Sequence, residues 1–177
     1  TRSEASMTAT ATKSTGLEGM IAGDTAICAV KQDDLLYRGY SVNDLAKKAT
    51  FEAVAFLLLR GEKPSDSELA AIKKELVAER ELPRLVSDYL DACAPSVASG
   101  AAGPMDVCRT AVSLMGNADP ESQDNSADAE YRKSVRILAK MPQVIGRMQA
   151  AIDYQPAVAP DASLDHAANL CWQSTRQ

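Results

Sequence analysis

The apolar segment at residues 50–61 (TFEAVAFLLLRG) constrains the fold more than any other part of the chain. Thr50 has the side chain of a helix N-cap, and Gly61 can end a helix in the left-handed conformation. Between them, five apolar side chains share one helical face: Phe51, Val54, Ala55, Leu58 and Leu59. Because Phe56 and Leu57 widen that face, we expect a mostly buried helix.

Similar start and stop signals predict further helices on both sides of this segment. Ser41 can cap a helix over 42–49 with Asp44 at the capping-box position, and Ser65 can cap one over 66–80. In the latter, the apolar spacing predicts three inward side chains: Leu69, Ile72 and Leu76. A helix over 84–93 follows Pro83, and we expect the small residues and glycines of 94–103 to form a flexible loop.

The second half of the chain is also predicted to be helical. Pro104 opens a helix that Gly116 stops, with an apolar stripe of Met105, Cys108, Val112 and Met115. The acidic DPESQD sequence (119–124) is expected in a solvated loop. A helix over 129–151 should be bent or broken at Pro142, because proline lacks the amide hydrogen of a helix interior. Ser163 or Asp165 should start the last helix.

Strand signals are confined to the beginning of the chain. The runs at 25–30 and 35–38 flank the polar KQDD and predict one short β-hairpin. Only 5% of the residues are aromatic, which disfavours a β-sandwich. The expected fold class is therefore all-α and multi-helical with one short N-terminal β-hairpin. Residues 1–15, small and polar, are expected to be disordered.

Charge and hydropathy exclude several classes of function. The formal net charge is −5 and no basic stripe is present, so nucleic-acid binding has no electrostatic support. No apolar run is long enough to span a bilayer, and the N-terminus lacks the apolar core of a signal peptide. We therefore expect a cytoplasmic protein that binds neither nucleic acid nor membrane.

The residues that could carry chemistry do not form a set. The four cysteines (Cys28, Cys93, Cys108 and Cys171) are widely separated, which argues against a metal site or a disulfide framework. Cys28 and Cys108 are expected to be small buried side chains. The glycines of 16–23 do not follow a strand or precede a helix, so they fit no phosphate-binding loop.

Three side chains have a functional and a structural interpretation. His166 is the only histidine; as a catalytic base it would need a converging partner, and a structural or capping role is the simpler interpretation. Arg38 could clamp an anion, or it could tie the hairpin to helix carbonyls or to Asp44. Arg109 could pair with Asp106 or with a neighbouring helix. The structural interpretation is favoured for all three.

Six motifs in one order resemble the citrate synthase family, and are most similar to its bacterial citrate and 2-methylcitrate synthases. They are GLEGMIAGDTAICAV, LLYRGYSVNDLAKKATFEAVAFLLLRGEKP, ELPRLVSDYLDA, PMDVCRTAVSLMG, ILAKMPQVIGRM and VAPDASLDHAAN. The resemblance implies that residues 16–177 are the N-terminal part of the family's large domain, truncated before the catalytic segments. It also implies a homodimer in the full-length family.

The activity implied by the resemblance is condensation of acetyl-CoA or propionyl-CoA with oxaloacetate, followed by release of CoA. A carboxylate and two histidines carry that chemistry, and arginines hold the dicarboxylate. His166 matches a histidine of the family that is not catalytic, so no catalytic, cofactor-binding or metal residue is assigned here. Acyl-CoA is expected as a substrate of the full-length family, with no bound cofactor.

Two other functions remain open from the sequence. The chain could be a non-catalytic helical partner that associates with a complementary C-terminal chain or with an intact synthase. It could also be a helical interaction domain unrelated to acyl-CoA chemistry, which requires the six motifs to match by accident.

Overall fold

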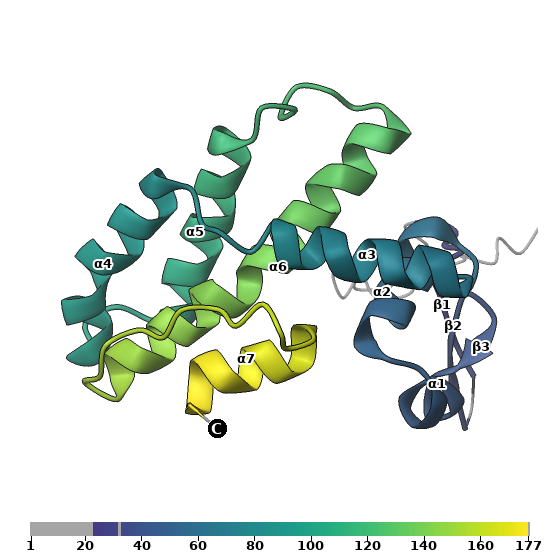
Figure 1. Cartoon of the computed structure of the whole chain (residues 1–177), viewed down its shortest axis with the longest axis horizontal. Coiled ribbons are helices and arrows are strands. Elements are labelled where there is room, and N and C mark those ends of the chain that lie inside the picture. Colours follow the sequence, from purple (N-terminus) through teal and green to yellow (C-terminus); the bar gives the residue numbers. More distant parts are fainter. Residues whose placement is uncertain (1–22, 32, 177) are drawn as a thin grey trace, which may run out of the picture.

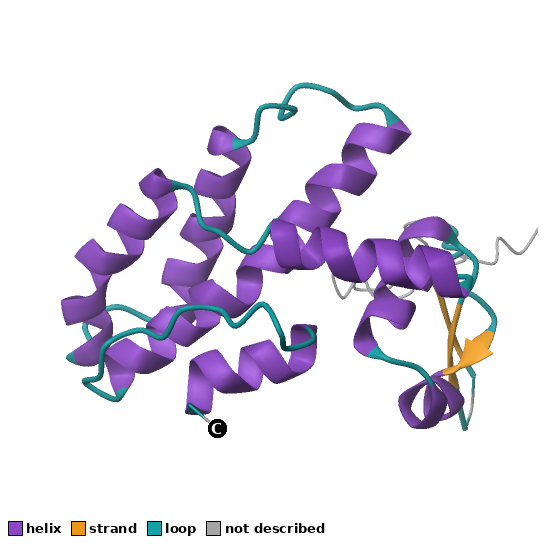
Figure 2. Ribbon diagram, viewed as in Figure 1, coloured by secondary structure: helices purple, strands orange, loops and turns teal. Residues whose placement is uncertain are grey.

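A computed structural model describes residues 23–31 and 33–176 (Figure 1). The N-terminal part of the chain that was predicted to be disordered, residues 1–15, lies outside the described residues, as does most of the glycine-containing segment 16–23. Helices dominate the described part, and a small sheet lies at one end (Figure 2). The predicted all-α class is confirmed.

The sheet has three strands rather than the predicted single hairpin. Strand β1 (Cys28–Val30) pairs antiparallel with β2 (Leu35–Tyr37), and β2 pairs with the two-residue strand β3 (Tyr40–Ser41). Arg38 and Gly39 make the second turn, with φ angles of +48° and +87°. Two consecutive positive φ angles suit the right-handed twist of a tight hairpin, so the turn folds the chain back into β3 before the first helix begins.

Helix α1 (Val42–Lys48) follows β3 directly, but Ser41 does not cap it with its side chain. The Ser41 hydroxyl instead donates to Oδ1 of Asp34, 3.1 Å away. Asp44 pairs with Lys48 at 3.3 Å and does not complete a capping box. The predicted cap is therefore wrong, and Ser41 ties the start of α1 to the hairpin.

Helix α2 (Phe51–Arg60) has the predicted caps, but only part of its predicted apolar face is buried. Thr50 accepts a hydrogen bond from the amide of Ala53, and Gly61 ends the helix with φ +94°. The buried side chains are Glu52, Phe56 and Leu57, whereas Phe51 is 44% exposed. The predicted burial is thus confirmed for Phe56 and Leu57 and wrong for Phe51 and Leu59, because the neighbouring helices cover the side of α2 that carries Glu52 and Phe56.

Helix α3 (Asp66–Ala78) begins with the capping box of Ser65 and Glu68, and buries Ile72 and Leu76 as predicted. Leu69, half-buried, packs against the same core. Helix α4 (Arg84–Ala98) is longer than predicted, since it continues through Pro95. Val97 in this extension is 4% exposed within the core, so the burial of Val97 offsets the hydrogen bond that Pro95 cannot donate.

Two further helices continue without a break through positions that were predicted to stop a helix or to bend or break it. Helix α5 (Pro104–Ala118) contains Gly116, and α6 (Ala127–Ile152) contains Pro142. One residue of the stripe predicted on α5 is wrong: Met105 is 77% exposed, whereas Cys108 and Met115 are buried and Val112 is half-buried. Helix α7 (His166–Thr175) starts at one of the two predicted positions, with Asp165 as its N-cap.

Helix α6 is the axis of the described fold, crossing between α4 and α5 on one side and α3 on the other (Figure 1). Two hydrophobic clusters pack against its two ends. One joins α4, α5 and α6 through side chains that include Val86, Leu90, Ala111, Val144 and Met148. The other joins α2, α3 and α6 through Phe56, Ile72, Leu76, Val135 and Ala139. Helix α7 lies along α6 near the middle of the molecule.

Candidate functional site

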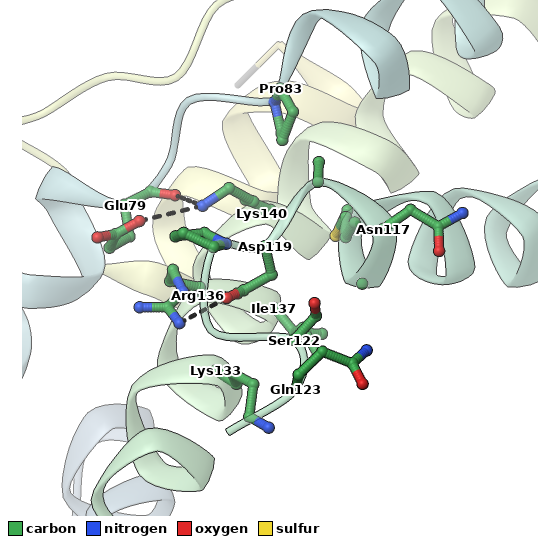
Figure 3. A pocket seen from close by; sticks show the side chains of 14 residues that line it. Glu79, Pro83, Asn117, Asp119, Ser122, Gln123, Lys133, Arg136, Ile137 and Lys140 are labelled. Atoms are coloured by element: carbon green, nitrogen blue, oxygen red, sulfur yellow. Dashed lines mark hydrogen bonds and ion pairs between the residues drawn. The ribbon is translucent and has the colours of Figure 1, made fainter. Parts of the chain in front are cut away.

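A hollow lined by polar and charged side chains lies between α6 and the loop that connects it to α5 (Figure 3). Its volume is about 800 Å³. Three cations of α6, spaced by three and four residues, reach its wall from one side of the helix: Lys133, Arg136 and Lys140. Such a row could bind an anion if the cations were free.

Acidic partners already neutralise this row. Nε and Nη2 of Arg136 donate to the two carboxylate oxygens of Asp119 at 2.7 and 2.8 Å, and Nη2 also reaches Glu121 at 2.7 Å. Nζ of Lys140 donates to the carbonyl and the carboxylate of Glu79. Lys133 pairs with Glu130 at 2.7 Å. The hollow is therefore built as a network of ion pairs rather than as an anion site.

The loop 119–124, predicted to be solvated, is held to α6 by two of its acids. Glu121 accepts from both Arg132 and Arg136, and these hydrogen bonds lower its pKa to about 2. For Asp119, burial opposes ionisation, but hydrogen bonds from Arg136 and from the backbone amide of Glu121 outweigh it and lower the pKa. We call Asp119, Glu121, Arg132 and Arg136 the loop clamp. The prediction of a solvated acidic loop is wrong for these two acids.

A second polar network is centred on the turn between α3 and α4. Arg80, 4% exposed, donates through its guanidinium to the carbonyls of Asp161 and Leu164. Its own carbonyl accepts from Gln143 of α6 at 2.9 Å. These bonds hold the segment between α6 and α7 against the other helices. Asn169 of α7 adds one more bond to the network, because its side-chain oxygen accepts from the amide of Asp161 at 3.0 Å.

His166 lies at the start of α7 in a buried environment. Its backbone amide donates to Oε1 of Glu52 at 2.9 Å, and its ring stacks on Phe51 with centroids 4.6 Å apart. Nδ1 is buried and has no hydrogen-bond partner among the described residues. Burial is the main cause that lowers the pKa of His166, and the positive charge of Arg80 lowers it further. The negative charges of Glu52 and Asp165 raise it, but they do not outweigh burial. These contacts hold the start of α7 against α2, and they do not include a nucleophile that His166 could activate.

The two arginines singled out from the sequence have structural roles. Nη2 of Arg38 donates to the carbonyl of Leu58 at 2.9 Å and so ties the hairpin to α2. Arg109 pairs with Asp106 on the exposed side of α5 at 2.8 Å. Both contacts agree with the structural interpretation, and neither arginine is brought near His166 by a contact in the described part of the chain.

The cysteines do not converge in the structure. All four are free; Cys108 is buried as predicted, whereas Cys28 is only half-buried. Burial raises the pKa of the Cys108 thiol, which reduces its reactivity. Within residues 23–31 and 33–176, no group of three histidine, cysteine or acidic side chains is placed to hold a metal ion.

An apolar groove lies along the open face of α2 and the neighbouring part of α6. Its volume is about 550 Å³. The residues that line it carry no formal charge: Tyr37, Phe51, Val54, Ala55, Leu58, Leu59, Ser134, Ile137, Leu138 and Met141. A face of this kind is typical of a surface that another polypeptide covers.

Sequence reasoning missed the residues that organise these sites. Glu52 and Arg80 gave no signal because their partners are backbone groups of segments far away in the chain, and Asn169 gave none because its partner is a loop amide. Arg136 lies one turn beyond Arg132, so their spacing could have indicated a cationic face toward the acidic loop.

Comparison with known proteins decides which family this arrangement represents. The family model for the citrate synthase C-terminal domain matches residues 16–177. The chain belongs to the citrate synthase family. It is 39% identical over 166 residues to the 2-methylcitrate synthase of Mycobacterium tuberculosis, covering 88% of this chain and 38% of that protein.

Other members of the citrate synthase family give the same result. The Haloferax volcanii citrate synthase is 37% identical over 170 residues, with 89% of this chain and 42% of that protein covered. The crystal structure of citrate synthase from Pyrobaculum aerophilum superimposes with a TM-score of 0.82 at 26% identity, covering 91% of this chain and 42% of that one. The chain thus spans about two fifths of the length of these relatives.

None of the helices in the described part is both long enough and apolar enough to cross a membrane.

Proposed function

We propose that this chain is a scaffold portion of a citrate synthase-like acyltransferase. The complete machinery condenses acetyl-CoA or propionyl-CoA with oxaloacetate and releases citrate or 2-methylcitrate together with CoA. Membership of the family supports this proposal, and the match to both citrate and 2-methylcitrate synthases leaves both acyl groups as candidate substrates. Homodimerisation, a cytoplasmic location and acyl-CoA as substrate without a bound cofactor are part of the same proposal.

The chain alone is proposed to be inactive, and His166 carries this part of the argument. The chemistry expected from the family uses two histidines and a carboxylate, and this chain has one histidine. That histidine is 5% exposed, faces Phe51 and uses its amide to anchor a helix. Measuring CoA release by the purified chain with either acyl-CoA and oxaloacetate tests the proposal; turnover at the rate of an intact synthase would contradict it.

A second candidate function is that of a helical partner for a complementary polypeptide. The uncharged groove on α2 and α6 favours it, because two adjacent helices leave an apolar face open. The test is to mix the chain with the part of the Haloferax volcanii citrate synthase that lies outside the matched region. A stable complex in size-exclusion chromatography is expected, and two separate species would contradict this function.

A further inference from the structure

The attachment of α7 to α2 depends on a histidine whose surroundings do not compensate a positive charge. The His166 side chain lies in the interior, flat against Phe51 at an interplanar angle of 8°. Its Nδ1 atom is buried without a partner among the described residues. Adding a proton there would place a charged donor in a site that offers it no acceptor, which is costly in a protein interior.

Three charged groups influence the protonation of the imidazole. Glu52 of α2 and the N-cap Asp165 attract a positive charge, and Arg80 of the α3–α4 turn repels one. Burial is the largest influence, and together with Arg80 it lowers the pKa of His166 despite the two acids.

We propose that the docking of α7 onto α2 is proton-sensitive, with His166 as the group that must stay neutral for the helix to remain seated against Phe51. A histidine whose pKa is lower in the folded state contributes its full stabilisation above the unfolded pKa of about 6.5. That contribution falls as the pH decreases below about 6.5 and is fully lost once the folded form is also protonated. This property does not depend on the proposed catalytic role of the family.

The chain carries its own probe of this contact. Trp172 is the only tryptophan and lies on α7, where its indole N–H donates to the carbonyl of Ala159 at 3.1 Å. His166 is the only histidine, so its ring protons can be followed without overlap from other imidazoles. The clamp acids Asp119 and Glu121 have lowered pKa values and titrate well below this range.

The test follows urea unfolding of the whole chain by Trp172 fluorescence at pH 7.5 and pH 5.5. The urea midpoint of the unaltered chain should be lower at pH 5.5 than at pH 7.5. In His166→Phe, which keeps the aromatic stack, the midpoint should fall by less than half of that amount. A direct titration of the His166 ring protons by NMR in the unaltered chain should give a midpoint below 6.5. An equal fall in His166→Phe, or an NMR midpoint at or above 6.5, would overturn the proposal.

Discussion

The backbone amide of His166 donates a hydrogen bond to Oε1 of Glu52, a residue 114 positions earlier in the chain. Glu52 is 2% exposed, so this carboxylate is buried at the point where the last helix meets the second. The bond satisfies one of the amides that the start of α7 leaves open, and it brings a negative charge to the positive end of the helix.

Replacing Glu52 by Ala should therefore destabilise the chain. The amide of His166 would lose its partner while remaining buried, which costs about 1–3 kcal/mol of unfolding free energy. Chemical denaturation measures this change. The exposed Glu62→Ala on the loop after α2 is the matched control and should shift the unfolding free energy by less than about 0.5 kcal/mol. Equal effects of the two variants would show that the Glu52–His166 contact does not stabilise the fold.

Two helical glycines should respond oppositely to alanine. A Cβ at Gly146 would lie 2.7 Å from Cβ and 2.9 Å from the carbonyl oxygen of Gln173, so Gly146→Ala should push α6 and α7 apart. A Cβ at Gly116 would meet nothing within 4 Å. Gly116→Ala should stabilise the chain by about 0.4–1 kcal/mol, because alanine is the better helix former.

Thermal unfolding of both glycine variants, each compared with the unaltered chain, provides the measurement. A lower melting temperature is expected for Gly146→Ala and a higher one for Gly116→Ala. If Gly146→Ala were the more stable variant, the close contact of α6 with α7 would not exist in solution.

The loop clamp should make stability sensitive to strong acid. The pKa of Glu121 is lowered to about 2 in the folded state, so its ion pairs contribute stability above the ordinary glutamate pKa of about 4.3. That contribution is lost as the pH falls from about 4.5 towards 2. Glu121→Gln should lose less stability than the unaltered chain over this interval in urea unfolding experiments.

Glu81→Gln is the control for the clamp, because Glu81 is an exposed acid outside it. It should keep the acid dependence of the unaltered chain. An acid dependence that is unchanged in Glu121→Gln would mean that the pairs with Arg132 and Arg136 do not hold the loop in solution.

The apolar groove should make the isolated chain associate or bind an apolar dye. Leu59, 37% exposed, lines the groove, whereas Leu85, 51% exposed, lies on α4 outside it. Leu59→Lys should reduce association in analytical ultracentrifugation with little change in unfolding free energy, because it places a charge on the open face. Leu85→Lys should leave association unchanged. If Leu85→Lys reduced association more than Leu59→Lys did, the surface through which the chain associates would lie outside the groove.

Local capping signals in the sequence predicted most of the helix ends they were applied to, although Ser41 does not cap α1 with its side chain. Thr50, Gly61, Ser65 and Asp165 act as caps or stops in the structure, because each role needs only neighbouring backbone groups. The signals failed at Gly116, which lies inside α5, and over the predicted loop 94–103, where α4 continues through Pro95; helix α6 is also not broken at Pro142. Burial of nearby side chains such as Val97 and Val144 outweighs the local cost there.

The direction of burial could not be predicted for α2, and this limited the prediction of the site. Apolar residues occur on both sides of this helix, so the sequence pattern does not say which face its neighbours cover. In the structure α3 covers Phe56, and the start of α7 lies over Glu52. The roles of Glu52 and Arg80 likewise follow from contacts between segments far apart in the chain, which no local pattern contains.

CoA release by the purified chain is the most direct test of the proposal that these helices are a scaffold portion that is inactive alone. The assay uses oxaloacetate with acetyl-CoA and, separately, with propionyl-CoA, and the intact citrate synthase of Haloferax volcanii serves as the active control. We expect the chain to release no more CoA than buffer does, while the control turns over. Sustained CoA release that depends on oxaloacetate would contradict the proposal.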